Sequence, residues 1–372
     1  MVEKVKIFFR ISKLGFGGAE QVFLSLAREF SKRGGISICF VVDQIDSDNV
    51  KTAINEGHLV HSLNASRTMK SIVPLAKFIK QEQPDVIISA YTDTNAAAIL
   101  SASLCGMSSR VIVSEHASLF EHWQNKSRLK KLILKSYVSY LYRLSTSVIC
   151  VSKGLSGQVA QLMGSTRRVK TIYNPVRSFS VNTVEKQHAN TTKQLIAVGR
   201  VAEPKDYSTL IRAVAKLNET SDYHLTIVGG IFSQSEFAKV TAVIEQLNIQ
   251  DKVTFAGYTD KVEDYYREAD IFVMSSAWEG FGNVIVEAMS LGLPVVSTDC
   301  NYGPAEILEN GKYGRLVSVG DSEALAAAIF QETLHPLVSK DALIIRAKDF
   351  SEKKVSNQYF KVISEVINAA NA

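Results

Sequence analysis

The stretch Ser275-Ser-Ala-Trp-Glu-Gly-Phe-Gly-Asn-Val-Ile-Val-Glu-Ala-Met-Ser-Leu-Gly-Leu-Pro-Val-Val-Ser-Thr-Asp299 decides the fold of this chain. The apolar residues 271–274 precede it and predict a buried strand. A helix is predicted from Asn283 to about Leu291, where a glycine and a proline end it and a second apolar strand follows. The stretch therefore predicts a strand–loop–helix–strand unit with a glycine-rich turn at the carboxyl end of its first strand.

Two carboxylates flank this turn. Gly280 and Gly282 allow the backbone to approach a ligand closely, and the free N–H groups at the following helix start suit a phosphate. Glu279 lies in the loop and Glu287 lies eight positions later on the helix. Taken singly, each could be an ordinary helix-start charge or a solvated helix residue. The complete pattern favours a binding site.

This pattern resembles the Glu–seven–Glu signature of the retaining, nucleotide-sugar-dependent glycosyltransferases of family four, which adopt the GT-B fold. The resemblance implies that Glu279 contacts the donor hexose and that Glu287 binds the ribose hydroxyls. It also implies that the turn and the helix start hold the diphosphate; these residues are Gly280, Phe281, Gly282 and Asn283.

The whole chain has the composition of a soluble globular protein. Its 372 residues are enough for two or more domains, with 46% hydrophobic and 21% charged residues. The net charge of +5 does not by itself indicate a nucleic acid partner, and none is expected, but it suits anionic nucleotides or an acidic membrane face. We expect neither a signal peptide nor a membrane-spanning segment.

The four cysteines lie far apart and show no metal-ligand spacing. We therefore interpret Cys39, Cys105, Cys150 and Cys300 as free thiols in a reducing cytosol. No Asp-x-Asp-type cluster occurs in the loops that we assign to the site, so we expect no metal and no cofactor beyond the nucleotide sugar as co-substrate.

The N-terminal half begins with a strand at Val5–Ile11, a glycine-rich turn and an amphipathic helix at Ala19–Lys32. The turn lacks the Gly-x-Gly-x-x-Gly spacing, which disfavours a nicotinamide or flavin site. Glu20 fits a first-turn helix charge better than a catalyst. The family resemblance implies that Gly17 and Gly18 line a cleft opposite the donor phosphates.

Strands and helices continue to alternate, which predicts a doubly wound parallel sheet. Glu115 and His116 follow a strand at Val111–Ser114, at the edge where such sheets bind ligands. From the residues alone, a histidine packed in a loop is the preferred interpretation. The resemblance instead implies that His116 contacts the donor sugar.

Asn125–Ser145 is the most basic segment, and leucines and tyrosines lie between its lysines and arginines. A basic amphipathic helix of this kind can lie on an anionic membrane surface. It can equally be a domain helix that packs on the sheet with solvated lysines, and both interpretations stay open.

A polar linker is predicted at 177–193, and a second alternating series follows it. Arg200 and Lys205 lie after its first strand, where two cations could clamp a diphosphate or could simply be surface charges. As Gly-Arg-x-x-x-x-Lys they resemble the family's second phosphate-binding element, although Asp206 stands where a glycine is common. The loops at Gly229 and Tyr258 would border the nucleobase by the same resemblance.

We therefore predict a GT-B enzyme with two doubly wound, Rossmann-like α/β domains and an interdomain cleft. An acceptor domain at 1–176, completed by the last helix at 353–372, would be joined by the linker to a donor domain at 194–352. The resemblance implies that four side chains carry catalysis, namely Glu279, His116, Arg200 and Lys205.

The expected reaction moves a hexose or N-acetylhexosamine, preferably from a UDP-sugar, to a polyprenyl-diphosphate-linked glycan, with retention. Lipopolysaccharide or capsule assembly at the cytoplasmic face of the membrane would be the setting. Rival interpretations are a transferase with a soluble acceptor, a sugar-nucleotide epimerase of the same fold, and a nucleotide-binding module without catalysis. Intact Glu279, Glu287, Arg200 and Lys205 argue against the last of these.

Overall fold

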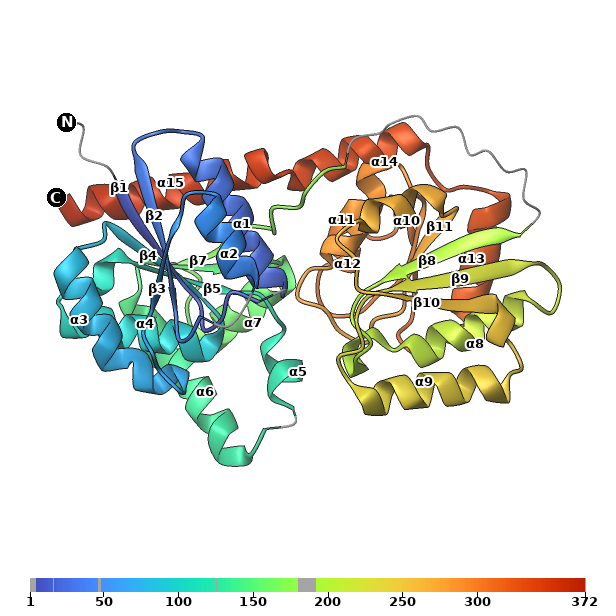
Figure 1. Ribbon diagram of the computed structural model, residues 1–372, viewed down its shortest axis with the longest axis horizontal. Coiled ribbons are helices and arrows are strands. Elements are labelled where there is room, and N and C mark those ends of the chain that lie inside the picture. Colours follow the sequence, from blue (N-terminus) through green and yellow to red (C-terminus); the bar gives the residue numbers. More distant parts are fainter. Residues whose placement is uncertain (1–4, 16, 46–47, 125, 180–191, 372) are drawn as a thin grey trace. The chain divides into compact units, whose positions relative to one another are not determined.

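The computed structural model describes residues 5–15, 17–45, 48–124, 126–179 and 192–371 (Figure 1). They form two compact units. Unit 1 comprises the chain up to Val176 together with Glu352 onward, and unit 2 comprises Arg177–Ser351. Most of the predicted linker, 180–191, lies outside the described residues.

Unit 1 is built on a seven-stranded parallel sheet in the order β3-β2-β1-β4-β5-β6-β7. Consecutive residues of the interior strand β1, Phe8 and Phe9, are both buried, because helices cover both faces of the sheet. The strands are β1 Val5–Arg10, β2 Ile36–Val42, β3 Leu59–Ser62, β4 Val86–Ala90, β5 Val111–Glu115, β6 Ser147–Cys150 and β7 Val169–Thr171.

The helices of unit 1 lie in two layers (Figure 1). In one layer α1 packs beside α15, and in the other α4 packs against α3 and α6. The α-helices are α1 Gly18–Ser31, α2 Asp48–Asn55, α3 Ile72–Glu82, α4 Thr92–Leu104, α5 Leu119–Trp123, α6 Arg128–Tyr140, α7 Lys153–Met163 and α15 Glu352–Asn371. Short 3-10 turns are η1 Thr68–Ser71, η2 Ser108–Arg110 and η3 Leu141–Leu144.

The last helix belongs to the core of unit 1. Buried side chains of α15, Val355, Tyr359 and Ile363, join the cluster formed by α1 and the sheet. Ser25 Oγ on α1 donates a hydrogen bond to Glu352 Oε1 over 2.7 Å. The chain therefore leaves unit 1 after Val176 and returns to it at its end.

Unit 2 is built on a six-stranded parallel sheet in the order β10-β9-β8-β11-β12-β13. Its first strand, β8, pairs with both β9 and β11, so the loops after these three strands lie side by side. The strands are β8 Lys193–Val198, β9 Tyr223–Val228, β10 Val253–Gly257, β11 Ile271–Met274, β12 Val295–Thr298 and β13 Arg315–Val317.

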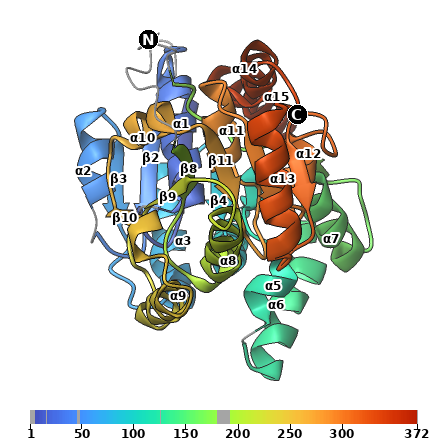
Figure 2. The same cartoon turned by 90° about the vertical axis from the view of Figure 1, so that its right-hand side faces the viewer.

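Helices cover both faces of this sheet as well (Figures 1 and 2). One layer contains α8, which packs against α9 and α13, and α11 packs against α14 in the other. The helices are α8 Tyr207–Leu217, α9 Gln234–Gln246, α10 Val262–Glu268, α11 Asn283–Ser290, α12 Pro304–Ile307, α13 Ser322–Leu334 and α14 Lys340–Ala347. The 3-10 turns are η4 Glu203–Lys205, η5 Gln250–Lys252 and η6 Lys348–Phe350.

The predicted fold class is confirmed, because each unit is a doubly wound parallel sheet. The prediction of free thiols is also confirmed, and only Cys105 among them is partly exposed. Within the described ranges, no helix is long and apolar enough to cross a lipid bilayer. The basic helix predicted at 125–145 is shorter in the structure. The α-helix α6 spans Arg128–Tyr140, and the 3-10 helix η3 follows it.

Candidate active site

The centre of the candidate site in unit 2 is an ion pair. Lys205 Nζ lies 2.5 Å from Glu279 Oε1, and both side chains are largely buried. Ser276 Oγ donates a second hydrogen bond to the same carboxylate oxygen, over 2.8 Å. The pair forms because β8 and β11 are neighbouring strands, so the loops that follow them meet. A fixed lysine and a fixed carboxylate thus lie together at the carboxyl edge of the sheet, where ligands bind in such folds.

Backbone contacts hold both partners of this pair. Ser275 Oγ donates to the carbonyl oxygen of Lys205 over 2.8 Å, and the Ala277 N–H donates to that of Pro204. On the other side, the Glu279 N–H donates to the carbonyl of Asn301 over 2.8 Å. The position of the ion pair is therefore set before any ligand arrives.

Gly303 lets the loop after β12 approach the glycine-rich turn. A Cβ atom at this position would lie 1.8 Å from the carbonyl oxygen of Phe281, and its φ of +109° is one that glycine adopts readily. The Phe281 ring, one of the predicted donor contacts, is buried and packs edge-on against Phe350, with ring centroids 5.5 Å apart. Its side chain therefore belongs to the core of unit 2, and a ligand at the turn would meet backbone.

The turn itself leads directly into α11. Gly282 has a φ of +99° and precedes the helix, which starts at Asn283. Gly280 lies between Glu279 and the buried phenylalanine. The predicted arrangement of a glycine-rich turn that opens a helix is therefore present, with the ion pair at its entrance.

Arg200 is exposed beyond the end of β8 and is held by a ring. Its guanidinium carbon lies 4.5 Å from the centroid of Phe232, whose side chain is 70% exposed. The part of the chain that the structure describes gives Arg200 no ion pair with a carboxylate. The structure thus presents a positioned cation with an unneutralised charge, which can meet an anion.

The neighbouring loops contribute Gly229 and Tyr258. A Cβ at Gly229 would lie 2.1 Å from the carbonyl oxygen of Gly199, so the close approach of two loops already explains this glycine. Tyr258 is 60% exposed and donates to Asp260 Oδ1 over 2.7 Å. Partial burial, with help from Asp260, raises its pKa to about 12, so its hydroxyl stays protonated at neutral pH. The assignment of both residues to the nucleobase stays a prediction.

Glu287 lies one turn into α11 and is partly buried. Tyr266 Oη donates to its Oε2 over 3.1 Å, a partner that sequence analysis did not identify. Burial raises the pKa of Glu287, and the positive charges of Arg177 and Lys205 partly oppose that rise. Lys205 is therefore close enough to influence both carboxylates of the Glu–seven–Glu pattern.

In unit 1, His116 follows β5 as predicted and is held as a neutral ring. Burial lowers its pKa to about 4, although Asn174 favours the charged form. The Ser114 hydroxyl donates its hydrogen to the carbonyl of Ser89 over 2.8 Å, so at 2.9 Å it must accept one from His116 Nε2. A neutral ring with its hydrogen on Nε2 has an acceptor at Nδ1.

Glu115, beside His116, points into the interior. Thr92 Oγ1 donates to its Oε1 over 3.0 Å, and Asn95 and Tyr142 donate to the same oxygen. Burial raises the pKa of Glu115 to about 7 despite these three hydrogen bonds. Glu115 is the last residue of β5 and its carboxyl is part of the core, so only His116 follows the strand, and its predicted contact with the donor sugar stays a prediction.

The first glycine-rich turn precedes α1. A Cβ built at Gly18 would meet no atom within 4 Å, and one at Gly17 would meet the Glu20 carboxylate. Glu20 lies in the first turn of α1, as predicted, and accepts a hydrogen bond from Tyr91 Oη over 3.2 Å. Among the residues of unit 1 that the structure describes, none lies where a side chain at position 18 would begin, and the predicted role of Gly17 and Gly18 toward the donor stays a prediction.

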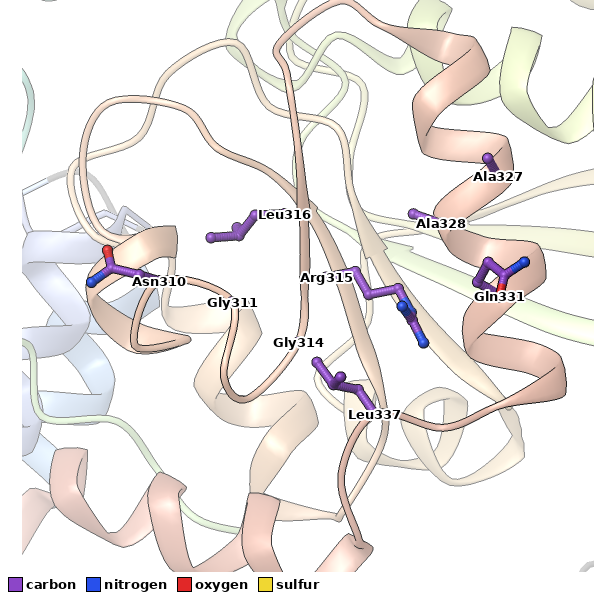
Figure 3. Close-up of a pocket in the computed structure, with 9 residues that line it drawn as sticks. All are labelled: Asn310, Gly311, Gly314, Arg315, Leu316, Ala327, Ala328, Gln331 and Leu337. Carbon is purple, nitrogen blue, oxygen red and sulfur yellow. The ribbon is translucent and has the colours of Figure 1, made fainter.

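Two further observations concern the site's surroundings. Among the described residues, no three His, Cys, Asp or Glu side chains are arranged to hold a metal ion. A hollow of about 440 Å³ lies elsewhere in unit 2, between β13, α13 and the preceding loop (Figure 3). Its lining includes Asn310, Arg315 and Gln331 but no residue of the Lys205–Glu279 region, so it is separate from the candidate site.

Comparison with known proteins decides the family. The model of the glycosyl transferases group 1 matches residues 180–336, and that of glycosyltransferase family 4 matches residues 16–178. The chain belongs to the family-four glycosyltransferases with the GT-B fold. In this family-four glycosyltransferase the group 1 model covers unit 2 and the family 4 model covers unit 1. The Glu–seven–Glu pattern lies within the group 1 match.

Two relatives of this glycosyltransferase come from Campylobacter jejuni. One is the N-acetylgalactosamine-N,N'-diacetylbacillosaminyl-diphospho-undecaprenol 4-alpha-N-acetylgalactosaminyltransferase, 25% identical over 97% of this chain and 100% of the relative. The other is a GalNAc-alpha-(1->4)-GalNAc-alpha-(1->3)-diNAcBac-PP-undecaprenol alpha-1,4-N-acetyl-D-galactosaminyltransferase, 28% identical over 98% of this chain and all of the relative. Among solved structures, Anabaena HepE in complex with UDP and glucose has the same fold, with a TM-score of 0.80 and 20% identity over 97% of this chain and 100% of HepE.

Proposed function

We propose that this glycosyltransferase moves a hexose or N-acetylhexosamine from a UDP-sugar to a polyprenyl-diphosphate-linked glycan, with retention of anomeric configuration. The observation that carries the proposal is the Lys205–Glu279 pair at the carboxyl edge of the unit 2 sheet, beside the glycine-rich turn and the exposed Arg200. The two Campylobacter jejuni relatives are named for N-acetylgalactosaminyl transfer in undecaprenol-diphosphate-linked glycans.

The cations of the site suit a diphosphate. An ammonium group has three N–H donors, so Lys205 can keep its bond to Glu279 and still donate to a phosphate oxygen. Arg200 adds a planar guanidinium with no carboxylate partner within the described residues. The N–H groups at the start of α11 add partial positive charge. Together they would stabilise the negative charge that develops on the leaving diphosphate.

The transfer step needs no separate base. The bond between the sugar C1 and the diphosphate oxygen breaks, and the acceptor oxygen forms a new bond to C1 on the same face. The acceptor's proton passes to the leaving phosphate oxygen, which gains charge as the bond breaks. Glu279, fixed by Lys205 and Ser276, would orient the sugar and stabilise the positive charge on its ring.

Two further side chains, the Glu287 carboxylate and the His116 imidazole, would bind hydroxyl groups of the donor. Glu287, with Tyr266 on one oxygen, is assigned to the ribose. His116 is neutral above about pH 4, so it would not neutralise a phosphate, and we assign it to a hydroxyl of the donor sugar. Both roles follow the family resemblance.

The proposals of a lipid-linked acceptor and of a membrane setting are supported by the exposed face of α6. Its residues Leu129 and Leu132 are exposed apolar side chains, and Arg128 and Lys135 are exposed cations on the same helix. Lys130, by contrast, is paired with Asp93 over 2.8 Å. Because Leu134 and Val138 are buried, the helix packs on unit 1 with one face and offers the other to an anionic membrane, as we propose, at its cytoplasmic side.

The test is the release of nucleoside diphosphate from a panel of UDP-, GDP- and ADP-sugars, with and without a polyprenyl-diphosphate-linked acceptor. We expect one UDP-sugar to give release that the acceptor accelerates. The variant Lys205→Ala should lose this release, and Lys216→Ala, at an exposed lysine on α8, should keep it. Binding of a sugar nucleotide without release under any condition would instead indicate a module without catalysis.

A further inference from the structure

A second hollow, in unit 1, is lined by cations. It has a volume of about 330 Å³ and lies between η3, the end of α7 and the segment that leads into β7. Three of its six lining residues are arginines, and none is acidic; the lining is Arg143, Met163, Gly164, Ser165, Arg167 and Arg168.

Two of these guanidiniums are fixed in place. Arg143 Nη2 donates to the carbonyl of Met163 over 2.5 Å, and Arg168 Nη1 donates to the carbonyl of Ser145. Gly164, at a φ of +65°, turns the chain after α7 so that the segment carrying Arg167 and Arg168 folds back beside Arg143. The hollow is therefore held by bonds between its own walls.

The hydrogen bonds from Arg143 and Arg168 to backbone carbonyl groups do not neutralise the positive charge of these guanidiniums. Each guanidinium has five N–H donors, and the two capping bonds use one donor each. The ion pairs of the described residues include none from Arg143, Arg167 or Arg168 to a carboxylate. Three adjacent, unneutralised guanidiniums repel one another, and a phosphate that accepts hydrogen bonds from them relieves this repulsion.

Within unit 1, the hollow lies at the opposite edge of the sheet from His116. It is beside the amino ends of β6 and β7, whereas His116 follows the carboxyl end of β5. A four-residue strand such as β6 separates the two edges of the sheet by about 13 Å. An anion in the hollow would therefore not share the site predicted around His116.

Exposed apolar side chains adjoin the hollow. Tyr140 and Leu144 are 67% and 47% exposed, and the Arg143 guanidinium lies 5.9 Å from the Tyr140 ring centroid. Tyr140 ends α6 and Leu144 ends η3. Their positions extend the exposed apolar face that Leu129 and Leu132 begin on α6. A free phosphate ion would need the arginines but not this apolar face. A lipid would use both.

We infer that Arg143, Arg167 and Arg168 form a site for the headgroup phosphate of an anionic membrane lipid, with Tyr140 and Leu144 against the acyl region. This inference deepens the proposed membrane setting and rests on it. It adds a specific binding site to a general attraction, because guanidiniums bind phosphate through paired, directed hydrogen bonds, which an ammonium cannot do.

The test replaces the three arginines with lysine, which keeps the positive charge but removes the paired N–H donors of the guanidinium. Binding of the full chain to vesicles of phosphatidic acid in phosphatidylcholine is measured for the parent and for Arg143→Lys/Arg167→Lys/Arg168→Lys. We expect this variant to bind about tenfold more weakly, because it loses at least one hydrogen bond between a guanidinium and the phosphate. The matched control is Arg33→Lys/Arg67→Lys/Arg110→Lys, three arginines of unit 1 outside the hollow, which should bind as the parent does.

Three further measurements distinguish the possible outcomes. The single variant Arg167→Lys leaves both capping bonds intact, so it should fold normally and still bind vesicles several-fold more weakly. Release of nucleoside diphosphate from the sugar nucleotide should be unchanged in every variant, which separates this inference from the proposed reaction. Vesicle binding equal to that of the parent in the triple variant would overturn the inference. If, in that case, inorganic phosphate also raised the melting temperature of the parent but not of the triple variant, the ligand of the hollow would be free phosphate.

Discussion

Lys205 and Glu279 are 74 positions apart in the sequence, and their side chains meet over 2.5 Å. The contact joins the loop after β8 to the loop after β11, two strands that pair directly. It brings the predicted diphosphate clamp and the predicted sugar-binding carboxylate into one group. Neither residue can therefore be treated as an independent part of the site.

The first prediction follows from this coupling. Lys205→Ala and Glu279→Gln should each lower turnover by about 10²- to 10³-fold, because each removes a fixed charge that stabilises the transition state. The double variant should lose much less than the product of the two effects, since residues that act as a unit are not additive. Steady-state rates of nucleoside diphosphate release for all four proteins measure this. Full additivity would show that the pair does not work as a unit.

The second prediction concerns the ring under Arg200. Phe232→Ala should raise the KM for the sugar nucleotide several-fold, because a cation–π contact worth about 0.5–1 kcal/mol no longer positions the guanidinium. Phe232→Trp should restore the parent value. In an Arg200→Ala background, Phe232→Ala should have no further effect on KM. An equal loss in both backgrounds would mean that the ring acts on the ligand directly and not through Arg200.

A third prediction is that activity survives a chelator. In the proposed reaction Lys205 and Arg200 would supply the positive charge that a divalent ion could otherwise supply, so EDTA should leave the rate of sugar-nucleotide cleavage within about twofold. The rate is compared before and after chelation and after adding magnesium or manganese. Complete loss with recovery on adding either ion would contradict this account of the leaving-group site.

The fourth prediction is a dependence of stability on pH that arises at Glu115. Burial raises its pKa from 4.5 to about 7. Between these values the folded chain holds a proton that the unfolded chain has released, so the free energy of unfolding falls as the pH rises through this range. The expected fall is a few kcal/mol, at about 1.4 kcal/mol for each pKa unit.

Glu115→Gln should remove this fall. Urea unfolding at pH 5 and at pH 7.5 gives the difference between parent and variant, and Glu268→Gln, at an exposed position on α10, serves as the control. His116, whose pKa is lowered, acts in the opposite direction, which is why the comparison must be made between variants. Parallel pH profiles for the parent and Glu115→Gln would show that the buried carboxyl ionises normally.

Much of the fold could be predicted from local patterns. The helices predicted at Ala19–Lys32 and from Asn283 to about Leu291 are observed as Gly18–Ser31 and Asn283–Ser290, because apolar spacing and clear end signals coincide there. Helix α9 was not predicted, since only Val240 and Ile244 are buried along its length and the apolar periodicity is weak. Local patterns also placed Glu279 and Glu287 on a turn and a helix.

The site's contacts could not be predicted in the same way. The bond between Lys205 and Glu279 depends on the order of strands in the sheet, which sequence spacing does not specify. The pairing of Tyr266 with Glu287 and the inward direction of the Phe281 ring depend on packing. The charge state of His116 depends on how deeply unit 1 buries it. Each of these is a property of tertiary structure.

The proposed sugar transfer is tested most directly by measuring the transfer of radiolabelled sugar from a UDP-sugar into a lipid-soluble product. The purified chain is incubated with a polyprenyl-diphosphate-linked glycan, and the label in the organic phase is compared with the UDP released. We expect one sugar to be transferred for each UDP released, an anomeric linkage in the product that matches the donor's, and loss of both signals in Lys205→Ala. Release of UDP with no label in the lipid phase, for every UDP-sugar and lipid-linked acceptor supplied, would contradict the proposed transfer.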